Sequence, residues 1–229
     1  MSDLTAIFKP ALLVIDFQED FCPPHGSLAV PDGRTILPIL NALLLLPFAL
    51  KIATRDFHPK NHVSFASNHP GASPYTSNFS ITHPTNPSLS YTTTLWPDHC
   101  VQNTTGSSLI PELDVSRVDR IIEKGKNPDV EMYSAFYDPF HISDSGLKDV
   151  LKGAGITDVF VVGLAADYCV KASAEHAVDE GFRTYIVEEA TKPVSPEEWP
   201  EVKRGIREHG VKFISLGGRE LGRVQDLVI

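Results

Sequence analysis

The chain has 229 residues, of which 42% are hydrophobic and 21% are charged, as in soluble globular proteins. Its 29 acidic residues against 20 basic ones give a net charge of −9, which excludes an extended nucleic-acid-binding surface. The length suffices for one α/β domain with a substantial core, so we expect a single domain over residues 1–229.

Cysteine use and hydropathy indicate the compartment. The three cysteines, Cys22, Cys100 and Cys169, are an odd number without framework spacing, which is typical of free thiols in a reducing compartment. The N-terminus lacks the charged and apolar blocks of a signal peptide, and the longest apolar run, around Leu40 to Leu50, is too short to cross a bilayer. These features predict a cytoplasmic protein with neither a membrane nor a nucleic-acid partner.

Apolar runs alternate with helical patterns along the chain. We expect strands at Ala11–Ile15, Leu50–Thr54, Arg117–Ile122, Val159–Val162, Arg183–Val187 and Val211–Ile214. Helices are expected at Gly33–Leu46, Ser143–Lys152, Asp167–Ala177 and Ser195–His209, the last opened by a capping box at Ser195–Glu198. This alternation predicts a parallel sheet with right-handed crossovers.

One long segment, 59–98, has little periodicity and many Pro, Ser, Thr, Asn and His residues. A structureless segment of this length is uncommon inside a compact domain. Its aromatic residues are Phe65, Tyr75, Phe79, Tyr91 and Trp96. Because a linker would not carry so many aromatic side chains, we expect a folded lid over a binding site.

Cys169 lies where a buried strand, punctuated by Gly163, gives way to an Ala-rich helix. The unpaired N–H groups and the dipole of a helix N-terminus would stabilise a thiolate there. The same N–H groups could hold an oxyanion that forms beside the sulfur. The alternative is that Cys169 is a small core residue, as most free cysteines are.

Two further residues fall at the same edge of the predicted sheet. Asp16 and Lys124 each follow a strand, and the carboxyl ends of parallel strands share one edge. Asp16 could take the thiol proton, and Lys124 could hold the thiolate and carboxylate by charge. Taken singly, Asp16 is typical of a loop cap and Lys124 of a surface lysine beside Gly125.

A metal site is suggested by Asp56-x-His58 together with the distant His99. Two imidazoles and one carboxylate suit a borderline divalent ion such as zinc and leave positions open. The spacing alone is a weak signal because the chain has 9 histidines. His62 and His69, in the same segment, are the main rival ligands.

Five motifs, in order, resemble those of the nicotinamidases, which belong to the isochorismatase-like cysteine hydrolases. They are DFQEDF at Asp16–Phe21, TRDFHP at Thr54–Pro59, LWPDHCV at Leu95–Val101, Lys124–Gly125 with YSAF at Tyr133–Phe136, and GLAADYCV at Gly163–Val170. The resemblance implies an α/β single domain of the isochorismatase-like, Rossmann-like three-layer sandwich type. Its six-stranded parallel sheet is flanked by helices on both faces, and a long metal- and substrate-binding loop spans about 57–101.

The resemblance also implies roles for individual residues. The catalytic triad would be Asp16, Lys124 and Cys169, with backbone N–H groups of Ala165 and Cys169 as the oxyanion hole beside a cis Leu164–Ala165 peptide. One divalent ion, expected to be Zn²⁺ with Fe²⁺ or Mn²⁺ as alternatives, would be held by Asp56, His58 and His99, and no other cofactor is implied. Ser64 falls where some members place a further ligand or a water-binding residue. The implied substrate pocket contains Phe21, Trp96, Tyr133 and Leu164.

Two positions are singled out beside these motifs. Glu19 stands where the family often has Asn, and it could raise the pKa of Asp16 or reach a metal-bound water. Asp98 could support the metal ligands from outside.

The implied activity is the hydrolysis of nicotinamide to nicotinate and ammonia through a thioester on Cys169, in NAD salvage, with pyrazinamide as a further substrate. One alternative is hydrolysis of another amide, such as an N-carbamoyl or ureido compound, by a relative without the metal set. The other is a catalytically silent nicotinamide-binding protein, although intact Asp16, Lys124 and Cys169 argue against it. The sequence leaves open whether the chain forms homo-oligomers and where the segment Gly217–Ile229 packs.

Overall fold

The strand β1 (Pro10–Ile15) lies at the centre of the molecule because it is apolar on both faces. Leu12 and Val14 belong to one buried layer, whereas Leu13 and Ile15 belong to the other. Successive side chains of a strand point to opposite faces, so an uninterrupted apolar run fills two cores at once. The computed structural model describes residues 7–227.

The main sheet has six strands, all parallel, in the order β5-β2-β1-β6-β7-β8. Besides β1, these are β2 (Leu50–Asp56), β5 (Arg120–Lys124), β6 (Asp158–Leu164), β7 (Arg183–Lys192) and β8 (Lys212–Ile214). The prediction of a six-stranded parallel sheet is confirmed. All of the strands therefore present their carboxyl ends at the same edge.

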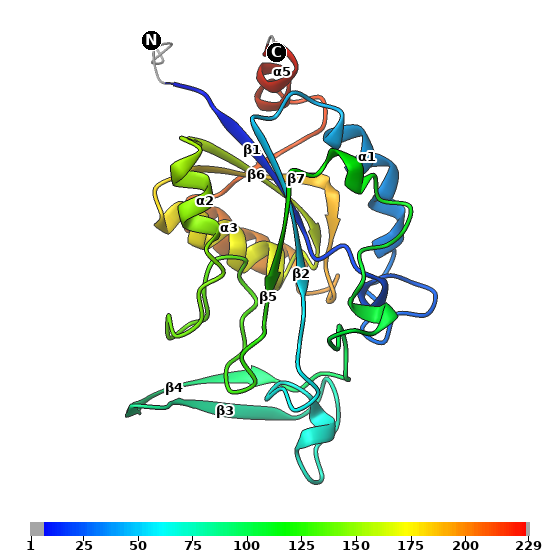
Figure 1. Ribbon diagram of the computed structural model, residues 1–229, viewed down its shortest axis with the longest axis vertical. Helices are drawn as coiled ribbons and strands as arrows, with labels where there is room; N and C mark the ends of the chain where they lie inside the picture. Colours follow the sequence, from blue (N-terminus) through cyan, green and yellow to red (C-terminus); the bar gives the residue numbers. More distant parts are fainter. Residues whose placement is uncertain (1–6, 228–229) are drawn as a thin grey trace.

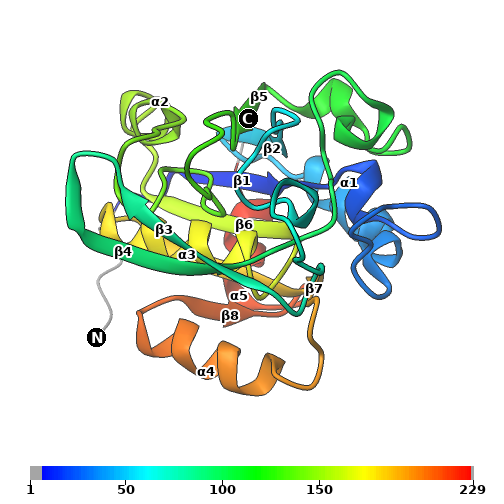
Figure 2. The ribbon, with the colours of Figure 1, turned by 90° about the horizontal axis from the view of Figure 1, so that it is seen from below.

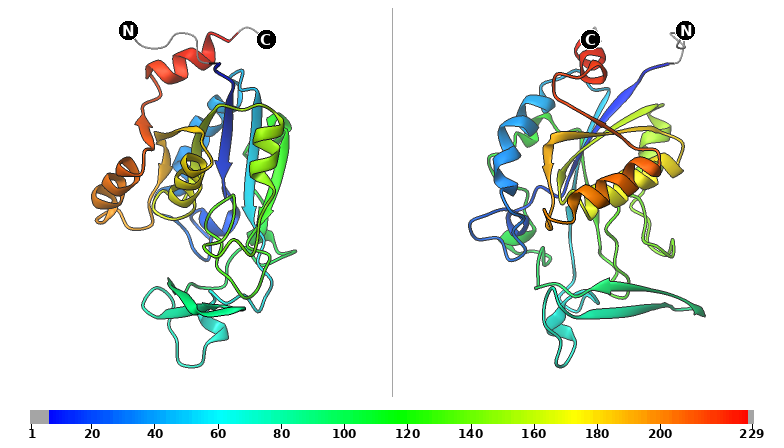
Figure 3. Two further views of the ribbon diagram at one scale, coloured as in Figure 1. Left: turned by 90° about the vertical axis from the view of Figure 1, so that its left-hand side faces the viewer. Right: turned by 180° about the vertical axis from the view of Figure 1, so that it is seen from behind.

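Helices cover both faces of this sheet (Figures 1 and 3). α1 (Leu37–Leu44) and α5 (Arg219–Gln225) contribute side chains to one core. α2 (Leu147–Gly153), α3 (Cys169–Asp179) and α4 (Trp199–Glu208) contribute to the other. The sequence left open where the C-terminal segment packs, and its described part packs on the domain itself. Leu221 and Val224 of α5 are buried in the domain's own core.

The segment between β2 and β5 is not structureless. It contains an antiparallel hairpin of β3 (Asn78–His83) and β4 (Asn86–Thr94), which lies beyond the carboxyl ends of the main sheet (Figures 1 and 2). The segment was expected to be a folded lid, but neither of these two strands was predicted. The hairpin could not be recognised in the sequence because most of its positions are exposed and most are Ser, Thr or Asn, so the apolar alternation of a half-buried strand is absent.

Several predicted boundaries are also wrong, and β7 in particular continues to Lys192, past its predicted end at Val187. Pairing of β5 with β2 begins at Arg120 opposite Ile52, and a 3₁₀ turn precedes it, so the strand starts later than Arg117. Helix α2 begins at Leu147, after Gly146 with a φ of 79°. The proposed capping box does not form, since Ser195 makes no side-chain cap and α4 begins only at Trp199.

Among residues 7–227, no helix is long and apolar enough to cross a membrane.

Candidate active site

Asp16, Lys124 and Cys169 meet at the carboxyl edge of the sheet. Asp16 directly follows β1, Lys124 is the last residue of β5, and Cys169 is the first residue of α3. All three side chains are buried, with exposed fractions of 0%, 1% and 4%. The interpretation of Lys124 as a surface lysine is therefore wrong.

The ammonium group of Lys124 links the three residues. Its Nζ lies 3.0 Å from Asp16 Oδ2 and 3.6 Å from Cys169 Sγ. It also donates hydrogen bonds to the Met132 carbonyl at 3.2 Å and to Asp56 Oδ1 at 2.6 Å. The Thr54 hydroxyl donates to Asp16 Oδ1 at 2.6 Å and fixes that carboxyl group. The site thus contains a thiol, a carboxylate and a cation in mutual reach.

The electrostatics of this group set the protonation states from which a reaction would start. Burial raises the pKa of Asp16 to about 6, although the nearby Lys124 charge opposes the shift. Burial also raises the pKa of the Cys169 thiol well above its usual range, again against Lys124. Burial lowers the pKa of Lys124, but Asp16 and Asp56 outweigh it and keep the amine protonated. At neutral pH the site therefore holds a thiol beside an ionised carboxylate.

Two backbone N–H groups lie next to the sulfur. The Leu164–Ala165 peptide bond is cis, as the resemblance implied. Within the described residues, the N–H groups of Ala165 and Cys169 donate to no protein acceptor, whereas those of Tyr168 and Val170 both donate to the Ala165 carbonyl. Free donors at a helix N-terminus can hold negative charge that develops beside the sulfur.

Asp56, His58 and His99 form a second group in which the candidate ligand atoms lie within 4.8 Å of one another. The Nδ1 atoms of His58 and His99 are hydrogen-bonded to the carbonyl oxygens of Gly125 and Pro97, each at 2.8 Å. His58 Nε2 is buried, lies 3.5 Å from Asp56 Oδ2 and has no hydrogen-bond partner among the described residues. Imidazoles held through one nitrogen, with the other facing a carboxylate, fit a divalent metal ion.

The charge states of His99 and Asp56 also fit. Burial lowers the pKa of His99 to about 3, which keeps the imidazole neutral as a metal ligand requires. Burial raises the pKa of Asp56, but the Lys124 charge more than offsets this and holds the carboxyl ionised. Burial lowers the pKa of His58, but the Asp56 carboxylate outweighs it and raises that pKa above its usual value, so a metal ion would displace a proton from this imidazole.

Gly125 is required at the turn that supports His58. Its φ of 65° lies in the left-handed region, and a Cβ atom there would approach His58 Cε1 to 2.4 Å. Only glycine allows the carbonyl of this turn to accept from His58 so closely.

Of the two rival metal ligands, His62 lies beside the candidate metal group and His69 does not. His62 is buried, its ring centroid lies 4.1 Å from that of His58, and its Nδ1 is hydrogen-bonded to Ser64 Oγ at 2.8 Å. A second set of possible metal ligands shares His58 with the first and consists of His58, His62 and Glu131. The sequence analysis did not identify Glu131 as a possible ligand. His69 lies apart, because its Nε2 is hydrogen-bonded to the Val63 carbonyl at 2.7 Å and its ring packs on Phe79.

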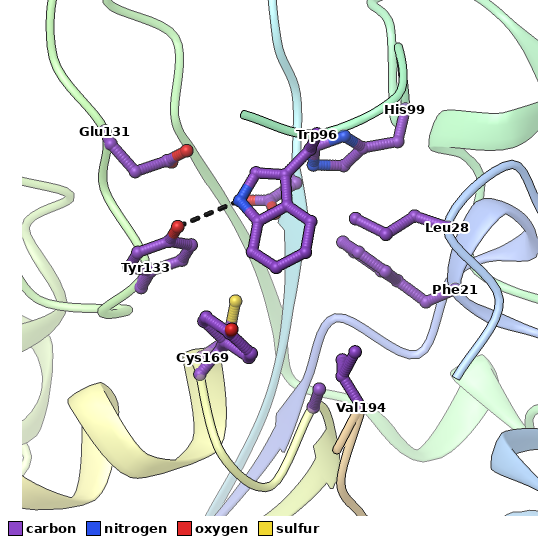
Figure 4. A pocket seen from close by; sticks show the side chains of 11 residues that line it. Phe21, Leu28, Trp96, His99, Glu131, Tyr133, Cys169 and Val194 are labelled. Atoms are coloured by element: carbon purple, nitrogen blue, oxygen red, sulfur yellow. Dashed lines mark hydrogen bonds between the residues drawn. The ribbon is translucent and has the colours of Figure 1, made fainter. Parts of the chain in front are cut away.

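A narrow cavity connects the two groups (Figure 4). Its lining includes Cys169 and Ala165 from the first group, Asp56 and His99 from the second, and several aromatic side chains. The full lining is Phe21, Leu28, Asp56, Trp96, His99, Glu131, Tyr133, Ala165, Tyr168, Cys169 and Val194. The arrangement suits a flat ring with one polar group at each end.

Three of the four predicted pocket residues line this cavity: Phe21, Trp96 and Tyr133. Leu164 does not, because its side chain is fully buried in the core on the α1 face. The sequence missed Leu28, Glu131, Tyr168 and Val194. Two of these could have been found from their neighbours in the sequence, because Tyr168 directly precedes Cys169 and Glu131 lies two residues before Tyr133. Leu28 and Val194 lie near no predicted site residue.

The two singled-out acids do not join the site. Glu19 forms an ion pair with Arg34 at 2.6 Å and is partly exposed. Asp98 is exposed and accepts a hydrogen bond from Ser67 Oγ at 2.5 Å. The expected roles of Glu19 beside Asp16 and of Asp98 behind the metal ligands are therefore wrong, since both carboxylates point to other partners.

Known proteins are similar to this chain in sequence and in fold. The isochorismatase domain family matches residues 10–217. The nicotinamidase of Schizosaccharomyces pombe is 38% identical over 91% of this chain and 94% of its own length. The structure of yeast nicotinamidase bound to the inhibitor nicotinaldehyde superimposes with a TM-score of 0.85 at 33% identity, covering 90% of this chain and 99% of that one.

A third relative bears on the metal group. The structure of a Pyrococcus horikoshii pyrazinamidase in complex with zinc superimposes with a TM-score of 0.71 at 33% identity, over 91% of this chain and 99% of that one. Together, the matched length and identities place the fold and the enzyme class, an amidohydrolase. The chain therefore belongs to the isochorismatase family and, within it, to the nicotinamidases.

Proposed function

We propose that the chain hydrolyses nicotinamide to nicotinate and ammonia, with Cys169 as nucleophile. The observation that supports this most is the single cavity that joins the Cys169 thiol to His99 and Asp56. A pyridine carboxamide has a carbonyl carbon for the sulfur and a basic ring nitrogen for the opposite end. Phe21, Trp96 and Tyr133 provide flat walls for the ring between them.

In the first half of the reaction, Asp16 accepts the Cys169 proton while the sulfur attacks the amide carbon. The carbonyl oxygen takes up the negative charge, and the N–H groups of Ala165 and Cys169 donate to it. Asp16 then returns the proton to the amide nitrogen, the C–N bond breaks, and ammonia leaves. The acyl group remains on the sulfur as a thioester.

In the second half, a water molecule attacks the thioester carbon and Asp16 accepts its proton. The C–S bond breaks, nicotinate is released, and the thiol regains the proton. Lys124 stays protonated throughout and offsets the charge that alternates between Asp16 and Cys169. The chain's own groups thus supply the nucleophile, the shuttled proton and the charge balance.

Asp56, His58 and His99 would hold one divalent cation, for which Zn²⁺ is our first choice. When bound, it supplies Lewis acidity toward the ring nitrogen of the substrate. Pyrazinamide would be accepted as well, because its second ring nitrogen replaces a C–H group and does not enlarge the ring. The product would feed the salvage of NAD.

The test is ammonia release from nicotinamide by the purified chain, with metal content determined on the same sample. The unmodified chain and Cys22→Ala should release ammonia, whereas Cys169→Ala should not. Cys22 is a matched control because it is also a buried free cysteine but lies outside the cavity lining. Full activity in Cys169→Ala, or none in the unmodified, metal-loaded chain, would contradict the proposal.

A further inference from the structure

The hairpin strand β4 makes two side-chain contacts with the wall of the cavity. Tyr91 Oη accepts a hydrogen bond from the Glu131 N–H at 2.9 Å and donates to the Glu131 carbonyl at 3.2 Å. Thr93 Oγ1 lies 2.9 Å from Tyr133 Oη. Residues two apart in a strand face the same side, so Tyr91 and Thr93 together hold the segment that carries Glu131 and Tyr133.

The direction of the hydrogen bonds around Tyr133 follows from donor chemistry. The indole N–H of Trp96 can only donate, and it lies 2.9 Å from Tyr133 Oη, so the phenol oxygen accepts there (Figure 4). The Thr93 hydroxyl donates to the Thr94 carbonyl at 3.5 Å, so its Oγ1 accepts the phenol hydrogen of Tyr133. A directed chain results, from Trp96 through Tyr133 to Thr93.

We propose that Thr93 is a positioning residue that fixes the Tyr133 and Trp96 rings as walls of the slot for the substrate's ring, an inference that rests on the proposed function. Thr93 is 4% exposed and does not line the cavity, so it acts only through Tyr133. Without its hydroxyl, the phenol hydrogen would have no acceptor in a buried place, and the ring would turn to find one. Trp96 would lose its fixed partner in turn.

The inference also bears on specificity. Since the Tyr133 hydroxyl donates to Thr93, it has no hydrogen left for a ligand, and the Trp96 N–H is likewise occupied. Both residues then contact the substrate through ring carbon atoms. This side of the slot favours a ring edge without polar substituents.

Thr93 contacts the ring walls and not Asp16, Lys124 or Cys169, so its loss should weaken binding more than chemistry. In Thr93→Val, which keeps the branched shape, we expect KM for nicotinamide to rise about tenfold, because one buried hydrogen bond contributes roughly that factor to affinity. We expect kcat to stay within about twofold. The inhibition constant of nicotinate should rise by the same factor as KM.

Two further variants separate this role from general damage to the hairpin. Thr93→Ser keeps the hydroxyl and should restore KM. Thr92→Val changes the neighbouring, exposed threonine on the opposite face of β4 and should leave KM unchanged. An unchanged KM in Thr93→Val, a kcat that falls in proportion to kcat/KM, or no rescue by serine would overturn the inference.

A measurement without substrate keeps the test independent of the proposed function. The chain has 2 tryptophans, so a Trp199→Phe background reports on Trp96 alone. Acrylamide quenching of Trp96 fluorescence should increase in Thr93→Val and not in Thr92→Val. If the unmodified chain released no ammonia, the function would fail while this result still decided the positioning role; equal quenching in both variants would overturn it.

Discussion

The Nζ atom of Lys124 lies 2.6 Å from Oδ1 of Asp56, closer than its 3.0 Å to Oδ2 of Asp16. One buried ammonium group therefore joins the carboxylate beside the thiol to the carboxylate of the candidate metal group. Two buried carboxylates without this cation would repel each other and lack a counter-charge. The two groups of the site are in this sense one electrostatic unit.

Lys124→Met should therefore damage both catalysis and stability. With the cation gone, Asp16 and Asp56 face each other without compensation, and the pKa of Asp16 should rise further. We expect kcat to fall at least about 100-fold, and the free energy of unfolding to fall by about 3 kcal/mol, as when one partner of a buried ion pair is removed. Steady-state kinetics and urea unfolding measure the two effects.

Lys126→Met is the matched control. Its side chain is 57% exposed, and its ion pair with Glu123 is long, at 3.9 Å. It should leave both quantities unchanged. A Lys124→Met enzyme with near-normal kcat would show that the ammonium group is not needed at the site.

The pH dependence of kcat/KM should report Asp16. The carboxylate must be ionised to accept a proton, and burial raises its pKa to about 6. Activity should therefore be full above that pH and fall about tenfold per pH unit below it. Cys169 adds no loss near neutrality, since burial raises its pKa and the reaction starts from the thiol. An acid limb near the ordinary aspartate range would show that Asp16 is not the base.

The strands of the main sheet could be predicted because buried strands have a characteristic local composition. β1 and β6 are continuous apolar runs, and such runs leave few alternatives to a strand covered on both faces. The hairpin of β3 and β4 could not, because its strands are stabilised by contacts of Tyr91 and Thr93 with a distant segment. Those contacts have no signature in the hairpin's own sequence.

The candidate site shows the same division. Asp16, Lys124 and Cys169 were placed at one edge because parallel strands bring their ends together. Leu164 was misplaced because it sits in a motif whose side chains alternate, and its own points into the core. Val194 could not be found at all, since only the tertiary fold brings it to the cavity.

Gly125→Ala should remove the metal more than it unfolds the chain. The new Cβ would lie 2.4 Å from His58 Cε1, so the imidazole would have to leave the position in which it faces Asp56. We expect the metal content after zinc loading to fall from about one ion per chain toward zero. Gly146→Ala is the matched control, because it has a φ of 79° but its Cβ would meet nothing within 4 Å. Equal metal content in the two variants would contradict a role of Gly125 in holding His58.

Zinc should stabilise the chain through Asp56, His58 and His99. A ligand that binds only the folded state raises its stability by mass action, so at free zinc about 1000 times the dissociation constant we expect the unfolding temperature to rise by about 10 °C over the chelated protein. Differential scanning fluorimetry with a chelator, and after zinc is restored, measures this shift. His58→Ala should abolish it, whereas His69→Ala should keep it, because His69 is hydrogen-bonded to the Val63 carbonyl outside the group. The same shift in His58→Ala as in the unmodified chain would place the zinc at another site.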